Sequence, residues 1–399
     1  MNSAEILSII GRNASLFEED IQSHATKLSN EISTSNFLIL GAAGSIGQAV
    51  TKEIFKRNPK KLHVVDISEN NLVELVRDLR SSYGYISGEF KSFALDIGSL
   101  EYDAFFEKDG SYDFILNLSA LKHVRSEKDD FTLMRMINVN ILNTVKTIEQ
   151  AIEKGCKKYF CVSTDKAANP VNMMGASKRI MESYLWQYAD KIAISTARFA
   201  NVAFSDGSLL HGFQKRIEKK QPLVAPSDVK RYFVTPQESG ELCLMSCIFG
   251  LSGDTFFPKL VDQFQLTSFQ SIAENYLKYK GLNPYLCESE DDARSFFNNN
   301  FSTKGLWPCL FTKSDTTGEK PYEEFFTSEE QIDSNSYQNL GVIKNEMNYD
   351  SEILKYFLNA INSMRNSKKW NKIAIIELFK RVIPSFEHEE KGKFLDSKM

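Results

Sequence analysis

Short apolar runs alternate with amphipathic segments between residues 36 and 200, and this alternation limits the possible folds more than any other feature. Apolar strands are predicted at 37–40, 62–65, 90–95, 114–118, 159–162 and 192–196. Between them, apolar residues recur every three or four positions, which predicts helices at 45–57, 72–79, 134–154 and 173–188. Runs that are apolar throughout are typical of strands buried on both faces of a parallel sheet. The pattern therefore predicts an α/β protein built on a doubly wound parallel sheet.

The segments on either side of this alternating part differ from it in character. Residues 1–35 carry apolar residues at helical spacing and predict a helical N-terminal extension of two short helices. Residues 36–200 form the predicted sheet domain. Prolines interrupt residues 201–345, which we expect to form a smaller mixed α/β lobe that is interleaved with the sheet domain and has a loop at 305–320. Residues 346–399 are predicted to be helical and to end in a charged tail.

The composition excludes several classes of protein. A net charge of −4 argues against a dedicated nucleic-acid-binding protein, which usually carries a basic surplus. The most apolar stretch, residues 242–251, is shorter than the roughly 18 residues that a membrane-spanning helix needs, and it predicts a buried helix instead. The first residues lack the basic start and long apolar stretch of a signal peptide, so a cytoplasmic protein is expected. The six cysteines are scattered without a CxxC pair, which predicts reduced, packed thiols, and no metal site is predicted.

A glycine-rich turn, GAAGSIG at 41–47, connects the first predicted strand to the first predicted helix. Gly41 permits a tight turn, Gly44 lets the backbone approach a pyrophosphate, and Gly47 allows close packing of helix on strand. The free N–H groups at the start of the helix attract phosphates. Asp66 ends the second strand, where it can accept both hydroxyls of an adenosine ribose and repel a 2′-phosphate. The turn therefore predicts a Rossmann-type dinucleotide site that favours NAD over NADP, the alternative being a glycine-rich turn without a cofactor.

The GxxGxxG spacing of this turn is typical of the short-chain dehydrogenase/reductase superfamily. In such proteins the end of the third strand meets the adenine, and small residues at the end of the fourth strand let the dinucleotide lie across the sheet. The predicted dinucleotide contacts are Gly41, Gly44, Ser45, Ile46, Gly47, Asp66, Asp96, Ile97, Leu118 and Ala120.

The usual catalytic tyrosine of that superfamily, which precedes a lysine by four residues, is missing at the expected place. Met174 occupies the tyrosine position and Lys178 the lysine position. A thioether cannot exchange a proton, so either the acid and base lie elsewhere or the protein is inactive. Thr164, Asp165 and Lys166 directly follow the fifth predicted strand, at the edge where open α/β sheets bind ligands. This acid beside a base is a candidate general acid/base pair, with a surface ion pair as the alternative.

The segment STDKAANPVNMMGASK at 163–178 resembles nucleotide-sugar 4,6-dehydratases of the extended short-chain class. The closest branch is that of the UDP-N-acetylglucosamine 4,6-dehydratases of bacterial polysaccharide and glycoprotein biosynthesis. Further segments that resemble this family are IIGR (9–12), ALKHV (120–124), RFANV (198–202), RYFVT (231–235), SEDDAR (289–294), SDTTGEK (314–320) and EEF (323–325). The resemblance covers nearly the whole chain and is weakest over the last fifty residues.

The residue at position 174 distinguishes two groups of enzymes within this branch. Enzymes with a tyrosine there are typically those that invert the configuration at C5, whereas Met174 resembles the retaining enzymes. Those retaining enzymes are membrane-anchored, and this sequence departs from them because no membrane span is predicted. The resemblance therefore implies a soluble, retaining enzyme.

The resemblance also implies a reaction. NAD takes a hydride from C4 of UDP-N-acetylglucosamine, water is lost across C5 and C6, and the hydride returns to C6 to give a 4-keto-6-deoxy sugar. Asp165 would protonate the departing C6 hydroxyl, and Lys166, with a lowered pKa, would act as the base at C5. Thr164 would bond to the C4 oxygen and Lys178 would hold the nicotinamide ribose, but no residue is identified that takes the C4 hydroxyl proton. The expected substrate contacts, each with a structural role as the alternative, are Lys122, Asn140, Arg198, Asn201 and Arg231.

Other functions fit parts of the same sequence. A nucleotide-sugar 4-epimerase would use the same cofactor. It would, however, be expected to carry a tyrosine at position 174 and no acid/base pair after Thr164. A catalytically silent NAD-binding sensor would explain the missing tyrosine, but not the presence of Asp165 and Lys166. The sequence leaves open whether the substrate carries UDP or GDP. We expect a homodimer or a larger homo-oligomer, because related enzymes assemble in this way.

Overall fold

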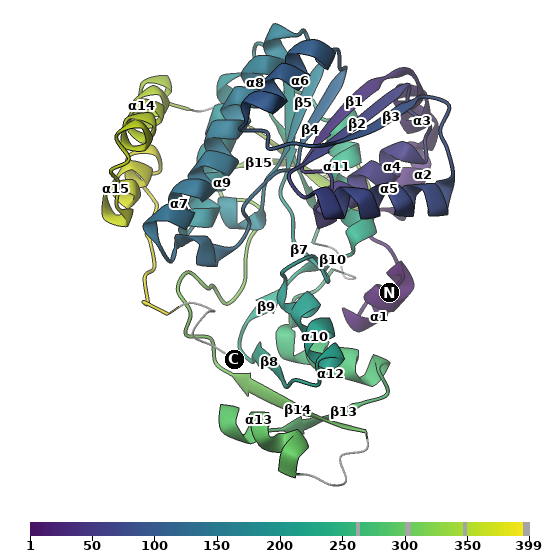
Figure 1. The fold of residues 1–399 in the computed structure, drawn as a ribbon, viewed down its shortest axis with the longest axis vertical. Helices are drawn as coiled ribbons and strands as arrows, with labels where there is room; N and C mark the ends of the chain where they lie inside the picture. The colour runs from purple at the N-terminus through teal and green to yellow at the C-terminus, as the bar shows by residue number, and fades with distance from the viewer. Residues whose placement is uncertain (261–263, 300–304, 346–348, 394–399) are drawn as a thin grey trace.

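A nine-stranded sheet forms the centre of the molecule (Figure 1). The computed structural model describes residues 1–399 except 261–263, 300–304, 346–348 and 394–399. The strand order is β15-β16-β11-β6-β5-β4-β1-β2-β3. The strands span Asn36–Leu40 (β1), Lys61–Asp66 (β2), Glu89–Ala94 (β3), Phe114–Asn117 (β4), Lys158–Val162 (β5), Ala193–Ala197 (β6), Asp254–Pro258 (β11), Gln331–Asp333 (β15) and Leu340–Lys344 (β16). Strands β1 to β6 and β11 run parallel, whereas β16 pairs antiparallel with β11, and β15 antiparallel with β16.

Helices cover both faces of this sheet, which confirms the predicted doubly wound α/β fold. Phe37 and Ile39 of β1 pack in one apolar cluster with α3, α4, α5 and α11, whereas Leu38 and Leu40 pack in another with α6, α8 and α9. Alternate side chains of a strand point to opposite faces, so an all-apolar strand needs both layers. These helices span Ala25–Thr34 (α3), Ser45–Phe55 (α4), Glu69–Tyr83 (α5), Leu100–Asp109 (α6), Asn143–Glu153 (α8), Met173–Gln187 (α9) and Pro236–Phe249 (α11).

The helix predicted at 134–154 is one helical run with a local change of pitch. Helix α7 spans Asp130–Ile137, a π-helical turn (η2) follows at Asn138–Leu142, and α8 continues the run. Single π-helical turns within α-helices occur frequently at functional sites. Here the turn contains Asn140, which is fully buried.

A smaller lobe lies below the sheet domain in the view of Figure 1. Its three-stranded sheet has the order β13-β14-β8, and two short two-stranded sheets, β7-β10 and β9-β12, lie above it. Its elements span Asn201–Val202 (β7), Leu209–Glu218 (α10), Leu223–Pro226 (β8), Lys230–Arg231 (β9), Phe233–Val234 (β10), Thr267–Ser268 (β12), Phe269–Tyr279 (α12), Asn283–Leu286 (β13), Glu290–Asn299 (α13) and Leu306–Thr312 (β14). The loop predicted at 305–320 is therefore wrong over its first half. The apolar residues at 306–311 form the central strand β14, and only the polar residues that follow lack regular structure.

The N-terminal extension forms three helices rather than the two predicted: Ser3–Ile9 (α1), Glu18–Ser23 (α2) and Ala25–Thr34 (α3). The extra break falls at His24, which lies between α2 and α3 with a non-helical backbone. Helix α1 packs in the apolar cluster of the small lobe, whereas α3 packs on the sheet. Arg12, between them, forms a bidentate ion pair with Glu238 of α11.

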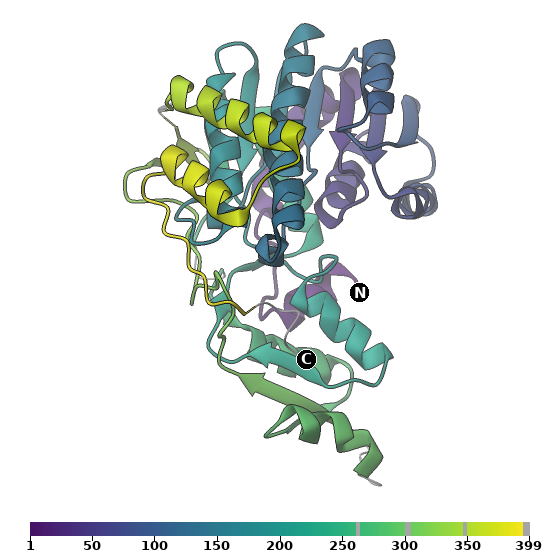
Figure 2. The ribbon, with the colours of Figure 1, turned by 60° about the vertical axis from the view of Figure 1, so that its left-hand side comes forward.

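The C-terminal part forms a hairpin of two helices, Ser351–Ser367 (α14) and Lys372–Val382 (α15). Figures 1 and 2 show the hairpin on the flank of the sheet domain, beside α7 and α9, and the chain then runs down toward the small lobe. Its apolar side chains share one cluster with those of α7, η2 and α9. Within the described ranges, no helix is long and apolar enough to cross a membrane.

Candidate active site

The glycine turn after β1 has almost no room for side chains. Gly41 has a φ of +75°, and a Cβ there would lie 2.7 Å from the backbone nitrogen of Ser119. A Cβ on Gly47 would lie 2.1 Å from the carbonyl oxygen of Gly41. A Cβ on Gly44, in contrast, would meet protein only at 3.6 Å. Gly41 and Gly47 are therefore required by the turn itself, whereas Gly44 borders space that a ligand can approach.

The start of α4 is arranged to receive an anion. No side chain caps its first turn, so backbone N–H groups there remain available to a phosphate. The Asp66 carboxylate accepts hydrogen bonds from the backbone N–H groups of Ala43 and Ser68, both at 2.9 Å, which fixes it beside the turn. Ser45 Oγ accepts the backbone N–H of Asp206 at 2.8 Å and so joins the turn to the small lobe.

The other predicted dinucleotide contacts lie at the ends of neighbouring strands. Asp96 is exposed after β3 and accepts the backbone N–H of Gly98 at 2.8 Å, and Ile97 next to it is buried. Leu118 is buried and Ala120 half-buried after β4. The carboxyl ends of parallel strands share one edge of the sheet, so these residues fit a dinucleotide stretched along that edge.

Thr164, Asp165 and Lys166 form a hydrogen-bonded cluster directly after β5. The Thr164 hydroxyl donates to Asp165 Oδ1 at 2.8 Å. The same oxygen accepts the backbone N–H of Lys166 at 2.9 Å and its Nζ at 3.1 Å. Asp165 is 4% exposed, so this carboxylate is shielded from water and held in one orientation. An acid, a base and a hydroxyl thus meet within one turn of chain.

The residues that surround Lys166 do not lower its pKa in the way that its expected role as a base requires. Burial favours the neutral amine, but the nearby charges of Asp165 and Glu323 outweigh burial and raise the pKa of Lys166 above its ordinary value. Lys166 is therefore an ammonium group in this arrangement. To act as a base, it has to lose its proton during the reaction.

Glu323 also belongs to this cluster. No role was expected for it from the sequence. Its Oε1 lies 3.8 Å from Lys166 Nζ and 3.8 Å from Nη2 of Arg231. Burial raises the pKa of Glu323, although the charges of Lys166 and Arg231 oppose this effect. The signal available in the sequence was the EEF segment at 323–325, but nothing in it indicates that the first glutamate meets a lysine more than 150 positions earlier.

Helix α9 packs directly against the acid/base cluster. A Cβ on Gly175 would lie 2.4 Å from the carbonyl oxygen of Lys166, so the first turn of α9 and the Lys166 backbone are in contact. Met174 is buried beside this contact. Lys178 is also buried and donates from Nζ to the carbonyl oxygen of Val162 at 2.9 Å. Desolvation lowers the pKa of Lys178.

The partners of Arg198 lie within the protein and argue against the expected substrate contact. Its side chain is fully buried, and all five of its guanidinium N–H groups donate within the protein. The acceptors are the carboxylates of Glu182 and Glu330 and the carbonyl oxygen of Phe325. No donor is left for a diphosphate, and the residue instead ties α9 to the segment that leads into β15.

Asn140 is also occupied within the protein. Its Oδ1 accepts the backbone N–H of Leu121 at 2.9 Å, and its Nδ2 donates to the Leu121 carbonyl oxygen at 3.1 Å and to Ser177 Oγ at 3.0 Å. The side chain therefore anchors the chain after β4 to α9, and the predicted direct contact with substrate is not supported.

Of the remaining expected substrate contacts, Arg231 and Asn201 lie in short strands of the small lobe and Lys122 follows β4. Arg231 is buried beside Glu323, donates to the carbonyl oxygens of Lys320 and Pro321, and pairs with Glu319. Lys122 Nζ donates to Ser205 Oγ at 3.3 Å, and desolvation lowers its pKa. Asn201 begins β7, which pairs with β10. These three residues stay predictions.

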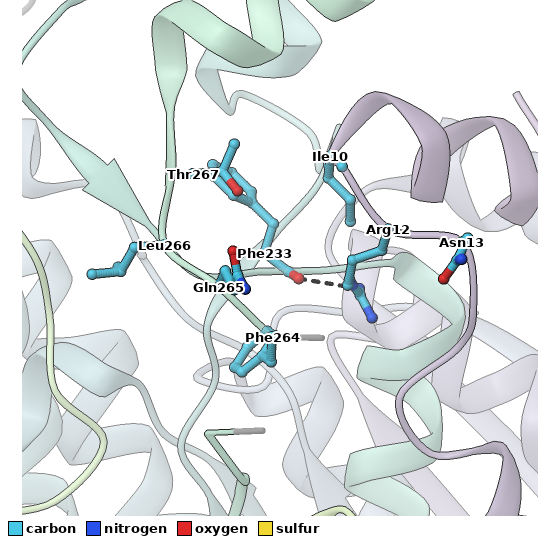
Figure 3. Close-up of a pocket in the computed structure, with 9 residues that line it drawn as sticks. Ile10, Arg12, Asn13, Phe233, Phe264, Gln265, Leu266 and Thr267 are labelled. Carbon is cyan, nitrogen blue, oxygen red and sulfur yellow. Dashed lines mark hydrogen bonds between the residues drawn. The ribbon is translucent and has the colours of Figure 1, made fainter. Parts of the chain in front are cut away.

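A separate cavity of about 210 Å³ lies where the N-terminal segment meets the small lobe (Figure 3). It is lined by residues 10–13, Phe233 and residues 264–267, and Arg12 donates across it to the Phe233 carbonyl oxygen at 3.2 Å. None of the predicted cofactor, catalytic or substrate residues lines it.

Known proteins resemble the chain over most of its length. It is 31% identical to an uncharacterized membrane protein of Methanocaldococcus jannaschii over 58% of this chain and 69% of that protein. It is 29% identical to a UDP-N-acetylglucosamine 4,6-dehydratase (inverting) of Campylobacter jejuni over 56% of this chain and 67% of that enzyme. It is 27% identical to the capsular polysaccharide biosynthesis protein CapD of Staphylococcus aureus over 82% of this chain, but it spans only about half (52%) of CapD.

A solved structure and a family model also match the chain. The crystal structure of Pen from Bacillus thuringiensis superposes with a TM-score of 0.65 and 21% identity, covering 82% of this chain and 98% of that one. This likeness shows the fold, an α/β domain on a mostly parallel sheet with a smaller lobe. The family model described as "Polysaccharide biosynthesis protein" matches residues 37–345, which include the glycine turn, the acid/base cluster and the small lobe. The chain belongs to this family of polysaccharide biosynthesis proteins.

Proposed function

We propose that the protein is an NAD-dependent 4,6-dehydratase that acts on UDP-N-acetylglucosamine and retains the configuration at C5. The observation that carries the proposal is the hydrogen-bonded Thr164–Asp165–Lys166 cluster, which lies at the same edge of the sheet as the glycine turn. It combines a hydroxyl, an acid and a base, which dehydration requires and which simple hydride transfer does not. The similarity to a named UDP-N-acetylglucosamine 4,6-dehydratase supports the same substrate.

The residues around the glycine turn fit the dinucleotide that this reaction needs. A Cβ on Gly44 would make only an ordinary contact with the protein, the start of α4 has no side-chain cap, and Asp66 is fixed beside the turn. There Asp66 would accept the hydroxyls of an adenosine ribose. Lys178 would hold the nicotinamide ribose. When bound, NAD would accept a hydride from C4 of the sugar and return it to C6.

Thr164 and Asp165 provide a path for the proton of the C4 hydroxyl, which Met174 cannot accept. The Thr164 hydroxyl would take this proton while it passes its own to Asp165, to which it is already hydrogen-bonded. Asp165 would then hold the proton that the departing C6 hydroxyl needs. The proton removed at C4 and the hydroxyl lost at C6 thus leave together as water, and the protons balance over one cycle.

Lys166 would act as the base at C5 once Asp165 has become neutral. Protonation of Asp165 removes one of the two charges that keep Lys166 an ammonium group. Glu323, a buried carboxylate at 3.8 Å, would take the released proton, because burial makes its neutral form favourable. Lys166 would then remove the C5 proton, return it after the hydride reaches C6, and recover its own proton from Glu323.

Retention follows if one group both removes and returns the C5 proton. Lys166 would act from a single face of the sugar, so the proton returns to the face it left. Inversion needs a second donor on the opposite face, and the thioether of Met174 is not a proton donor. The named C. jejuni relative is an inverting enzyme, so the stereochemistry is the part of the proposal that the test must decide.

The test is incubation of the purified protein with UDP-N-acetylglucosamine in heavy water, followed by mass spectrometry and proton NMR. The proposal predicts loss of one water, deuterium at C5 and the D-xylo product. An L-arabino product would overturn retention, and turnover of only the GDP sugar would overturn the substrate. A C4 epimer without loss of water would establish an epimerase instead. Absence of any product with NAD bound would overturn the enzymatic function.

A further inference from the structure

The C-terminal segment lies outside the part of the chain that matches the family, yet it packs on the helix next to the acid/base cluster. The family match ends at residue 345, before α14 and α15. Phe357 and Ile361 of α14 and Phe379 of α15 are fully buried in one cluster with Met173 and Met174 of α9. Tyr184 of α9 also donates to the carbonyl oxygen of Leu354 at 2.6 Å. The hairpin is therefore an integral support of α9.

Beyond the hairpin, the chain runs down toward the small lobe (Figure 2), and residues 386–393 join two further segments. The backbone N–H of Glu389 donates to the carbonyl oxygen of Val171, just before α9, at 3.0 Å. Thr317 donates from its backbone to the Lys393 carbonyl oxygen at 2.9 Å and from its hydroxyl to Glu390 at 3.1 Å. The N–H of Lys391 donates back to Thr317 Oγ1 at 3.0 Å. The tail thus connects the start of α9 to the loop that follows β14.

Glu127 and His388 form the centre of this connection. Glu127 is fully buried, and its Oε2 accepts both the backbone N–H of Met173 at 2.7 Å and Nε2 of His388 at 3.3 Å. Its Oε1 has no hydrogen-bond partner within the described part of the chain. A buried carboxylate is costly unless it is paired, so its orientation depends strongly on the contacts that Oε2 makes. His388 provides one of these two contacts.

The first turn of α9 transmits this arrangement to Lys166. Asn172 caps the helix through a bond from the N–H of Gly175 at 2.9 Å, and it also donates to the Gly318 carbonyl oxygen at 3.0 Å. Gly175 lies against the backbone of Lys166 with no space for a Cβ. A displacement of this turn therefore moves Lys166 directly.

We propose that residues 386–393 form a clasp that holds the first turn of α9, and with it Lys166, in the reactive position, and that Glu127 and His388 are its positioning residues. The proposal rests on the function of Lys166 proposed above. It assigns a role to a segment that lies outside the family match. Neither residue is expected to touch the substrate, so both act through the backbone of α9.

The test compares His388→Ala, His388→Gln and the unaltered protein. We expect His388→Ala to lower kcat roughly tenfold, because a small misplacement of a reacting group is costly. KM for UDP-N-acetylglucosamine should change by less than about twofold, because the substrate contacts remain. His388→Gln keeps an N–H donor at the Nε2 position and should recover most of the activity. Lys380→Ala is the matched control, since Lys380 is exposed on α15 and forms an ion pair with Glu377 one turn away.

Amide hydrogen exchange measures the mobility of the first turn of α9 directly and does not require catalytic turnover. The clasp predicts roughly tenfold faster exchange at residues 172–178 in His388→Ala and unchanged exchange in the strands of the large sheet. If His388→Ala unfolds the protein, Glu127→Gln replaces it, because an amide oxygen still accepts the Met173 N–H while the charge facing His388 is lost. Unchanged exchange at 172–178 in the folded variant would overturn the clasp. If exchange rises but the unaltered protein does not convert the sugar, the clasp stands and only the proposed reaction fails.

Discussion

The glycine turn and the acid/base cluster lie at the same edge of one sheet, yet they are built in different ways. The turn is determined by backbone contacts between segments that adjoin in the fold, such as Gly41 against Ser119. The cluster is determined by charges that come from distant parts of the chain, Asp165 and Lys166 on one side and Glu323 on the other. A change in the turn should therefore affect cofactor binding alone, whereas a change in the cluster should alter how protons are held.

The largest expected effect separates the two regions. Lys166→Ala and Asp165→Asn should each lower the rate of dehydration by roughly 10²–10⁴-fold, because each removes a group that transfers a proton. NAD affinity, measured by fluorescence titration, should stay as it is, because neither side chain contributes to the glycine turn. Lys215→Ala, which removes an exposed lysine of α10, serves as the control. Near-normal turnover in either variant would show that the acid/base assignment is wrong.

Arg198 should show the next largest effect, and it should appear in stability. Replacement by Met removes all five of its side-chain hydrogen bonds and leaves Glu182 and Glu330 with Arg179, at 3.2 and 3.3 Å, as their cationic partner among the described residues. Breaking this largely buried network should cost about 3 kcal/mol of unfolding free energy. Arg294→Met breaks an exposed ion pair on α13 and should cost less than about 1 kcal/mol. Denaturant titrations of both variants measure the difference. A raised KM with unchanged stability in Arg198→Met would restore the substrate contact that the structure argues against.

This case shows where prediction from the sequence succeeds and where it stops. The strands between residues 36 and 200 were predicted closely, because a strand such as β1, which is buried on both faces, leaves a local apolar pattern. The helix α6, Leu100–Asp109, was not predicted. The glycine turn was predicted because two of its glycines answer local backbone needs, Gly41 through its positive φ and Gly47 through its contact with the Gly41 carbonyl oxygen. The partners of Arg198 lie 16 and 132 positions away, and no local pattern indicates that both carboxylates reach it. The strand β14 was missed because its apolar residues are followed by a polar stretch whose composition is typical of loops.

Glu323→Gln should have a smaller effect that depends on pH. In the unaltered protein the proton of Lys166 would move to Glu323, so it stays within the site. With glutamine that proton must pass to solvent, so kcat should fall roughly tenfold near neutral pH. It should recover as the pH rises toward the pKa of Lys166, since more of the amine is then neutral.

The pH profile distinguishes this role from a purely structural one. Loss of a structural contact would lower kcat by a similar factor at every pH, whereas the proton-acceptor role requires the ratio of variant to unaltered kcat to increase with pH. Glu324→Gln is a matched control, because Glu324 is the exposed neighbour that accepts a bond from Asn169. A constant ratio across the pH range would remove Glu323 from the proton path.

Asp66→Asn should have the smallest effect, and it tests the turn in isolation. Asparagine keeps one oxygen that can accept the Ala43 N–H, so the turn should persist, but the negative charge is lost. That charge is what would repel a 2′-phosphate, so the preference for NAD over NADP should weaken by roughly tenfold while kcat with saturating NAD changes little. Titration with both dinucleotides measures the ratio. An unchanged preference would mean that Asp66 serves only the backbone of Ala43 and Ser68, and cofactor selectivity would then have to arise elsewhere along the strand ends.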